Sequence, residues 1–205
     1  MKLVEPIVRA DRRRVLGWGR ALPALACGAW LAPTMARPAT AWLPAPNLPD
    51  ATLQNHQGRD LRLLSDVMKD RVLLVHFFYT GCATVCPPQT ALLRELRRRL
   101  DVQAPARNPL FVGLSVDPLG DGPAQLRAYL QRFDIQAGRE AGWVWLTGHP
   151  TAMARVLRGF GVATAAPDQH PNLLWLGDTR RERWTRTASL QSPEQLAARL
   201  AEVMA

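Results

Sequence analysis

The chain has 205 residues, of which 47% are hydrophobic, so it is long enough for one globular domain with an extension. Its net charge of +9 is unevenly spread: residues 1–41 hold seven Lys or Arg and two Asp or Glu, which leaves +4 for the rest. No basic stretch is interleaved with aromatic residues, which argues against a nucleic-acid-binding protein, and no apolar run reaches the roughly 20 residues of a transmembrane helix.

Residues 1–41 have the pattern of an export signal or an N-terminal anchor. Arg12–Arg14 precede a moderately apolar run over residues 15–32, and small residues at 34–36 and 39–41 resemble cleavage sites. The consecutive arginines are similar to a twin-arginine signal. Cys27 follows Leu and Ala as a lipid attachment site would, although a thiol in a discarded peptide is the simpler interpretation. Export would place the remaining cysteines in an oxidising compartment, the periplasm, where the domain is free or tethered to the inner membrane.

Residues 42–49 contain three prolines and are predicted to form a stiff linker into a domain over residues 50–205. The first part of that domain, residues 50–63, suggests two short strands around a turn at Gly58. His56 lies at this turn and is expected to be exposed.

Two apolar strands and a helix are predicted next. Residues 71–79 are almost continuously apolar, which is typical of a strand covered on both faces, and residues 110–116 repeat the pattern. His76 interrupts the first run and is expected to be a hydrogen-bonded core residue. Between them, leucines at helical spacing predict a helix over residues 87–100.

The second half of the domain alternates in the same way. Asp117 and Asp121 are expected to form a turn and to cap the helix that starts at Pro123. The next predicted elements are a strand over residues 143–146 and a helix over residues 151–160, with His149 in the loop between them.

The last elements are a hairpin and a helix. The hairpin is predicted over residues 173–176 and 182–186 around Gly177-Asp178, and Ser192 starts the final helix with a capping box. The order β-β-β-α-β-α-β-α-β-β-α predicts an α/β fold: a thioredoxin-like central mixed sheet flanked by helices, with an N-terminal strand pair and a late β-hairpin.

Cys82 and Cys86 lie at the junction between the first apolar strand and its helix. A helix N-terminus favours the thiolate, and residues four apart in a first turn lie on one face with Cβ atoms roughly 5–6 Å apart. The two sulfurs could therefore bind one soft metal ion or close as a redox-active disulfide. A purely structural disulfide is disfavoured because closing so short a loop gains little.

The segment Phe78–Pro87, with its Cys-x-x-x-Cys-Pro sequence, is similar to that of the SCO/SenC proteins. The resemblance continues through residues 114–118, 145–148 and 168–176, where His170 stands a few residues before Trp175-Leu176.

This resemblance implies a thioredoxin-like, periplasmic or membrane-tethered protein that binds copper for assembly of the binuclear copper centre of cytochrome c oxidase. The implied ligands are Cys82, Cys86 and His170, and the implied partner is the copper-bearing oxidase subunit. A periplasmic thiol reductant or another copper chaperone is a further candidate partner. The residue types agree, because thiolates favour Cu(I) and imidazole suits copper in either oxidation state.

Two functions remain open at this point. A copper chaperone needs both cysteines reduced, so its copper state and its disulfide state exclude each other. A thiol–disulfide oxidoreductase would use Cys82 for attack and Cys86 for resolution, and His170 would be dispensable. A copper sensor cannot be separated from the first reading by sequence. A zinc site is disfavoured because only three protein ligands are evident, whereas structural zinc usually takes four.

Overall fold

The computed structural model describes residues 42–103, 108–163 and 165–205. The predicted export signal or anchor in residues 1–41, including Cys27, lies outside these residues and stays a prediction. No helix within the described ranges is long and apolar enough to span a bilayer.

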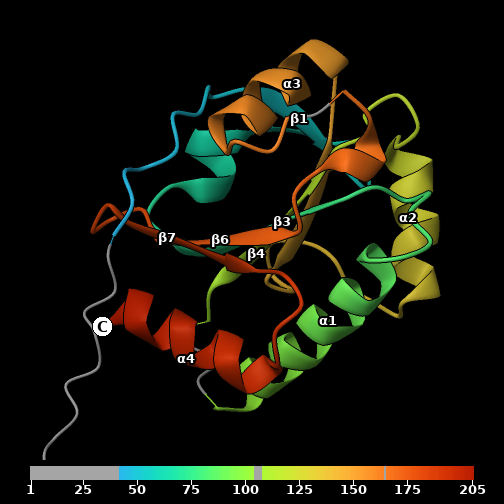
Figure 1. The fold of residues 1–205 in the computed structure, drawn as a ribbon. Coiled ribbons are helices and arrows are strands. Elements are labelled where there is room, and N and C mark those ends of the chain that lie inside the picture. The colour runs from blue at the N-terminus through green and yellow to red at the C-terminus, as the bar shows by residue number, and fades with distance from the viewer. Residues whose placement is uncertain (1–41, 104–107, 164) are drawn as a thin grey trace, which may run out of the picture. The chain divides into compact units, whose positions relative to one another are not determined.

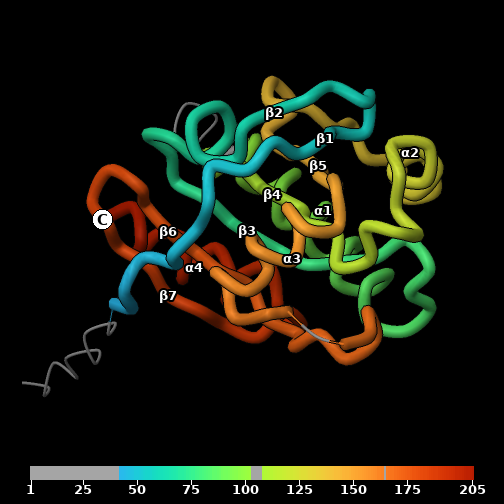
Figure 2. Tube along the Cα trace, turned by 90° about the horizontal axis from the view of Figure 1, so that it is seen from above, coloured from blue at the N-terminus to red at the C-terminus, as the bar shows by residue number. Residues whose placement is uncertain are grey.

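The described strands form one seven-stranded mixed sheet in the order β2-β1-β5-β4-β3-β6-β7, and Figure 2 shows them in succession across the domain. Strands β3, β4 and β5 are parallel, and the other neighbours are antiparallel. Their bounds are β1 (Thr52–Asn55), β2 (Asp60–Arg62), β3 (Val72–Phe78), β4 (Leu110–Ser115), β5 (Trp143–Thr147), β6 (Leu173–Asp178) and β7 (Arg183–Ala188). The predicted α/β fold with a mixed sheet, an N-terminal strand pair and a late hairpin is confirmed.

Helices cover both faces of this sheet (Figure 1). The α-helices are α1 (Cys86–Gln103), α2 (Pro123–Arg132), α3 (Pro150–Gly159) and α4 (Pro193–Met204). Buried residues of α1, α2 and α4 join one core cluster, and those of α3 join the other. A π-helical turn (Leu63–Met68) also packs in the second cluster, and a 3-10 turn (Pro167–Gln169) precedes β6; neither was predicted.

Strand β3 contributes side chains to both clusters, which explains its continuous apolar sequence. Leu73, Val75 and Phe77 face one cluster, whereas Leu74 and Phe78 face the other. A central strand with helices on both faces has no solvent-facing side, so polar alternation is absent.

His76 is a buried core residue, as predicted. Its Nε2 accepts a hydrogen bond of 2.9 Å from the indole Nε1 of Trp143. Gly113 pairs with His76 in the sheet, and a Cβ there would lie 2.8 Å from that same Nε2. Only glycine leaves room for the imidazole ring. Complete burial lowers the pKa of His76 to about 3, so the ring is neutral.

Of three local predictions, those for the hairpin turn and for His56 differ from the structure, whereas His149 lies in a loop as predicted and also caps a helix. The hairpin turns after Asp178, because Gly177 and Asp178 belong to β6 and the ring of Trp184 covers Gly177, where a Cβ would clash. His149 caps α3 with its Nδ1, which accepts from the backbone N–H of Thr151 at 3.3 Å. His56 is half-buried and not exposed, and its carbonyl accepts a hydrogen bond from Arg127.

Residues 42–49 lie against the domain at two points. The backbone N–H of Leu43 donates to the carbonyl of Trp184 at 2.7 Å, and Leu48 packs against the core cluster that contains α3. The chain therefore enters the domain beside the β6–β7 hairpin.

Candidate functional site

The sheet topology brings the three candidate residues to one end of the domain. Strands β3 and β6 are antiparallel, and His76 of β3 pairs with Leu174 near the start of β6. The carboxyl end of β3 and the amino end of β6 therefore meet. Cys82 and Cys86 follow β3, and His170 precedes β6, so all three lie beyond the same end of the strand pair.

The cysteine loop is shaped by backbone hydrogen bonds. The N–H of Cys82 donates to the carbonyl of Tyr79 at 3.2 Å, which closes a turn directly after β3. Helix α1 starts at Cys86, so Cys82 precedes the helix, and the expectation that both cysteines share a first helical turn is wrong. The sulfur of Cys82 instead accepts a hydrogen bond of 3.3 Å from the N–H of Cys86. A thiol thus serves as an acceptor for an otherwise unpaired amide at the helix start.

The two free thiols have opposite electrostatics. Burial opposes the charge on Cys82, but hydrogen bonds from the Cys86 thiol and from the N–H groups of Cys86, Thr84 and Val85 outweigh it and lower the pKa of Cys82 to about 7. Burial and the neighbouring Cys82 raise the pKa of Cys86 to about 12. The predicted helix-terminus effect therefore applies to Cys82 and is wrong for Cys86, because desolvation dominates there.

His170 presents one ring nitrogen for ligation. Its Nδ1 lies 3.3 Å from the carbonyl of Pro171, which can only accept, so Nδ1 carries the proton and Nε2 keeps its lone pair. The residue is 7% exposed, and burial lowers the pKa of His170 below its ordinary value. The neutral imidazole that binds metals is therefore favoured.

Tyr79 lies between the cysteines and the histidine. Its ring packs edge-to-face on His170 with centroids 6.4 Å apart. Its pKa is raised by burial first and then by the negative charge of Cys82, so the phenol is electrostatically coupled to that sulfur. Nowhere in the described residues do three His, Cys, Asp or Glu side chains gather closely enough to hold a metal ion. The three candidates share one end of the sheet without forming a closed cluster.

Asp121 is a buried residue of this region whose role the sequence did not reveal. Its carboxylate accepts from Thr80 and from Ser115, whereas the N-cap of α2 is Gly122. The predicted capping role of Asp121 is therefore wrong. Asp117 does form the predicted turn, since its carbonyl accepts from the N–H of Gly120 and of Asp121. The sequence signal was limited to an acidic residue two positions before Pro123, which fits a turn or a helix cap equally well.

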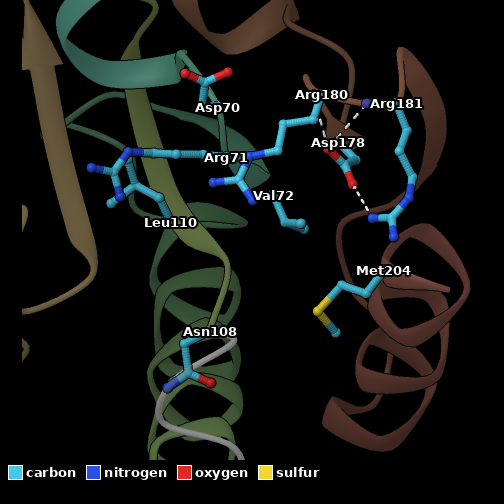
Figure 3. Close-up of a pocket in the computed structure, with 9 residues that line it drawn as sticks. All are labelled: Asp70, Arg71, Val72, Asn108, Leu110, Asp178, Arg180, Arg181 and Met204. Atoms are coloured by element: carbon cyan, nitrogen blue, oxygen red, sulfur yellow. Dashed lines mark hydrogen bonds and ion pairs between the residues drawn. The ribbon is translucent and has the colours of Figure 1, made fainter.

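The residues exposed next to the buried sulfurs in the sequence are uncharged: Gly81, Ala83, Thr84 and Pro88. At the opposite end of β3 lies a polar pocket of about 430 Å³ (Figure 3). It is lined by Asp70, Arg71, Val72, Asn108, Leu110, Asp178, Arg180, Arg181 and Met204. Among these lining residues only Met204 carries a soft donor atom, and the pocket lies at the end of β3 away from Cys82 and Cys86.

Comparison with known proteins identifies the family. The SCO1/SenC family model matches residues 48–205. The SCO1 protein homolog of Bacillus subtilis (strain 168) is 34% identical over 98 residues, which are 48% of this chain and 47% of the relative. The chain spans about half the length of the curated relatives it matches.

Two solved structures agree with this match. BsSco, a member of the Sco family of cytochrome c oxidase assembly proteins that has a disulfide switch, has a TM-score of 0.65 at 23% identity, and the match covers 80% of this chain and 95% of BsSco. Copper-bound ScoI of Bradyrhizobium japonicum has a TM-score of 0.58 at 28% identity and covers 74% and 96%. The predicted thioredoxin-like fold is confirmed.

Proposed function

This chain belongs to the SCO1/SenC family, and we propose that it binds one copper ion through Cys82, Cys86 and His170 and delivers it to the copper-bearing subunit of cytochrome c oxidase. The observation that carries the proposal is the meeting of the β3 and β6 ends, which puts both thiols and the imidazole beyond one end of the sheet.

The donor set fits copper as a cargo. Two thiolates and one imidazole are ligands that Cu(I) accepts, and three protein ligands leave the ion open to attack by ligands of a partner. Cys82 is ready to bind near neutral pH, whereas Cys86 must release a proton. Binding therefore releases protons and strengthens as the pH rises. Because the three residues do not form a closed cluster, ligation by all of them would require the His170 loop to move towards the sulfurs.

The relatives support this assignment. Copper is present in the Bradyrhizobium japonicum ScoI structure, and BsSco is described as belonging to a family of oxidase assembly proteins. Export through residues 1–41 would bring the domain to the periplasmic side of the membrane, where the thiols need a reductant before they can take up copper. A periplasmic thiol reductant or another copper chaperone is the partner that this requirement implies.

The test is copper titration of the reduced chain combined with X-ray absorption. We expect about one copper per chain with two sulfur neighbours and one nitrogen neighbour, and Cys82→Ser and Cys86→Ser should each abolish tight binding. His170→Ala should weaken binding by roughly 10- to 100-fold and remove the nitrogen neighbour. His149→Ala is the matched control, because His149 caps α3 and should leave the metal spectrum unchanged. An unaltered spectrum in His170→Ala contradicts the proposed ligand set.

A thiol–disulfide oxidoreductase is the second candidate, and the unequal pKa values of the two thiols favour it. The Cys82 thiolate would attack one sulfur of a partner disulfide, form a mixed disulfide and release the first partner thiolate. Cys86 would then lose its proton, attack the Cys82 sulfur and release the second partner thiolate. The partner gains two electrons, this chain loses two, and an external thiol reductant restores it. This function would be favoured if His170→Ala kept full thiol–disulfide exchange activity and if neither the wild type nor the variant bound copper.

A further inference from the structure

Asp121 is a buried carboxylate that is held entirely by hydroxyl and amide donors. It is 1% exposed. Its Oδ1 accepts from the N–H of Thr80 at 3.0 Å and from the Thr80 hydroxyl at 2.6 Å, and its Oδ2 accepts from the Ser115 hydroxyl at 2.6 Å. Among the described residues it forms no ion pair. A buried carboxylate is costly unless its hydrogen bonds are satisfied, so this arrangement calls for an explanation.

The stability of the neighbouring helix does not supply that explanation. The N-cap of α2 is Gly122, whose N–H donates to the side-chain oxygen of Gln125 at 3.2 Å, and within the described residues none of the hydrogen bonds of Asp121 goes to this helix. The bonds of Asp121 point away from α2, to the end of β4 and to the loop that follows β3. Thr80 stands two residues before Cys82, so the carboxylate acts on the segment that sets the position of that sulfur.

The hydrogen bonds of Asp121 form a clamp between Ser115 at the end of β4 and Thr80 in the loop after β3. Ser115 is the last residue of β4 and pairs with Phe78, the last residue of β3. The Ser115 hydroxyl accepts from the N–H of Asp117 at 3.0 Å and donates to Asp121, which fixes the direction of its proton. A hydrogen-bonded chain therefore runs from the β4–α2 turn through Ser115 and Asp121 to Thr80. Two hydrogen bonds to Asp121, one from the backbone N–H of Thr80 and one from its hydroxyl, restrain the loop.

We propose that Asp121 is a positioning residue of the thiol site, which clamps Thr80 to the end of β4 so that the Cys82 sulfur meets the N–H of Cys86. The proposal deepens the proposed function by naming a residue that prepares the thiol pair, and it applies to either function of that pair. If the clamp is released, the 3.3 Å contact between the Cys86 N–H and the Cys82 sulfur loosens, and the thiolate loses its stabilising donors.

The experiment measures thiol chemistry without metal, so it stays informative if the chain binds no copper. The reduced full-length chain is treated with iodoacetamide at pH 7, and the initial alkylation rate of Cys82 is followed by mass spectrometry. We expect Asp121→Ala to lower this rate by about fivefold, because the Cys86 N–H is then no longer held 3.3 Å from the Cys82 sulfur, where it stabilises the reactive thiolate. In a glutathione buffer, the two protein thiols and one oxidised glutathione exchange for the Cys82–Cys86 disulfide and two reduced glutathione molecules. This equilibrium should shift towards the protein disulfide by a similar factor, because the reduced form loses the hydrogen bond that stabilises it.

Matched variants separate the clamp from general destabilisation. Asp121→Asn retains an oxygen for Thr80 and should keep the wild-type rate. Asp117→Asn removes a charge from the same loop without touching Thr80 and should have no effect. Thr80→Val removes only the hydroxyl bond and should lower the rate by about twofold, which keeps the test available if Asp121→Ala does not fold.

Three outcomes would overturn the proposal. The first is an unchanged Cys82 rate in folded Asp121→Ala, or in Thr80→Val if the alanine variant does not fold. The second is an equal loss in Asp117→Asn. The third is an Asp121→Asn rate as low as that of the alanine variant, because a side chain that keeps the oxygen for Thr80 would then fail to hold the loop.

Discussion

The two ends of the β3–β6 strand pair show two ways of treating polar groups. At the carboxyl end of β3, the thiols receive hydrogen bonds from backbone amides, and His170 donates to a backbone carbonyl. At the other end, Asp178 is almost fully buried and accepts from the N–H groups of Arg180 and Arg181 and from the Arg181 guanidinium at 2.7 Å (Figure 3).

The difference separates stability from chemistry. At the end that holds Asp178 and Arg181, here called the arginine end, the carboxylate is paired with a guanidinium. Thr179 also exchanges hydrogen bonds with Arg71 across the two strands, which fixes the chain there. At the thiol end, neutral donors adjust the Cys82 sulfur without a permanent counter-ion, which suits the proposed exchange of a metal ion or a partner sulfur. A site that must exchange its partner cannot be locked by strong ion pairs.

The largest effect is expected in the reactivity of the two thiols of the reduced chain. At pH 7 about half of Cys82 and roughly one in 100,000 of Cys86 is thiolate if their pKa values are about 7 and about 12. The greater nucleophilicity of the more basic thiolate offsets part of this difference, so Cys82 should alkylate at least about 100-fold faster. Peptide mapping after brief iodoacetamide treatment measures the ratio. In urea the two rates should agree within about threefold, and similar rates in the folded chain would contradict the asymmetry of the site.

The second effect concerns the stability of the arginine end. Asp178→Ala should lower the free energy of unfolding by about 2–3 kcal/mol, because three donors lose their acceptor and Arg181 loses its partner. Urea denaturation measures the change. The Cys82 alkylation rate should remain that of the wild type, since the two ends are linked only through the sheet.

Arg181→Gln is the control for this second effect. The Arg181 side chain is 49% exposed, so its ion pair is screened and the variant should lose less than about 1 kcal/mol. A large loss in Arg181→Gln with a small one in Asp178→Ala would assign the stability to the ion pair and not to the amide bonds of the turn.

The sequence predicted most of the elements at both ends because their signals are local. The apolar runs of β3 and β4 and the capping box at Ser192 each lie within a few residues. The dipeptide Gly177-Asp178 is typical of turns and therefore predicted the hairpin turn at the wrong place. Here the glycine is required by the ring of Trp184, and the aspartate ends the strand as a buried acceptor.

The site was predictable only in part. Cys82 and Cys86 are close in sequence, and their chemistry follows from residue type, but the place of His170 at the same end of the sheet depends on the antiparallel pairing of β3 with β6. The burial that raises the pKa of Cys86 and the contact of Asp121 with Thr80 depend on tertiary packing. No periodicity or spacing encodes such contacts between distant segments.

The third effect is the pH dependence of the free energy of unfolding, and it is expected to come from His76, which lies in β3 between the two ends. Its folded pKa of about 3 is below the ordinary value of 6.5, so below pH 6.5 the unfolded chain takes up a proton that the folded chain refuses. Stability is therefore present above pH 6.5 and is lost as the pH falls towards 3. Between pH 7 and pH 5 this amounts to about 2 kcal/mol.

His76→Leu should flatten the unfolding free energy between these two pH values, although it costs about 1–2 kcal/mol at pH 7 because the Trp143 N–H loses its acceptor. Denaturation at a series of pH values measures the slope. His170→Ala serves as the comparison, because the pKa of His170 is also lowered by burial. If His170→Ala removes the slope and His76→Leu does not, the acid sensitivity belongs to the thiol end and not to the core.

The smallest effect is expected for the guanidinium groups that line the polar pocket without a partner. Within the described residues, the side chains of Arg71 and Arg180 form no ion pair or hydrogen bond, although their backbones are held by Thr179 and Asp178. Arg71→Gln and Arg180→Gln should each change the free energy of unfolding by less than about 0.5 kcal/mol and leave copper uptake and Cys82 alkylation unchanged. Urea denaturation and the alkylation assay measure both quantities on the same samples. If either substitution slowed Cys82 alkylation, the two ends of the strand pair would be coupled, and the separation of stability from chemistry would not hold for this domain.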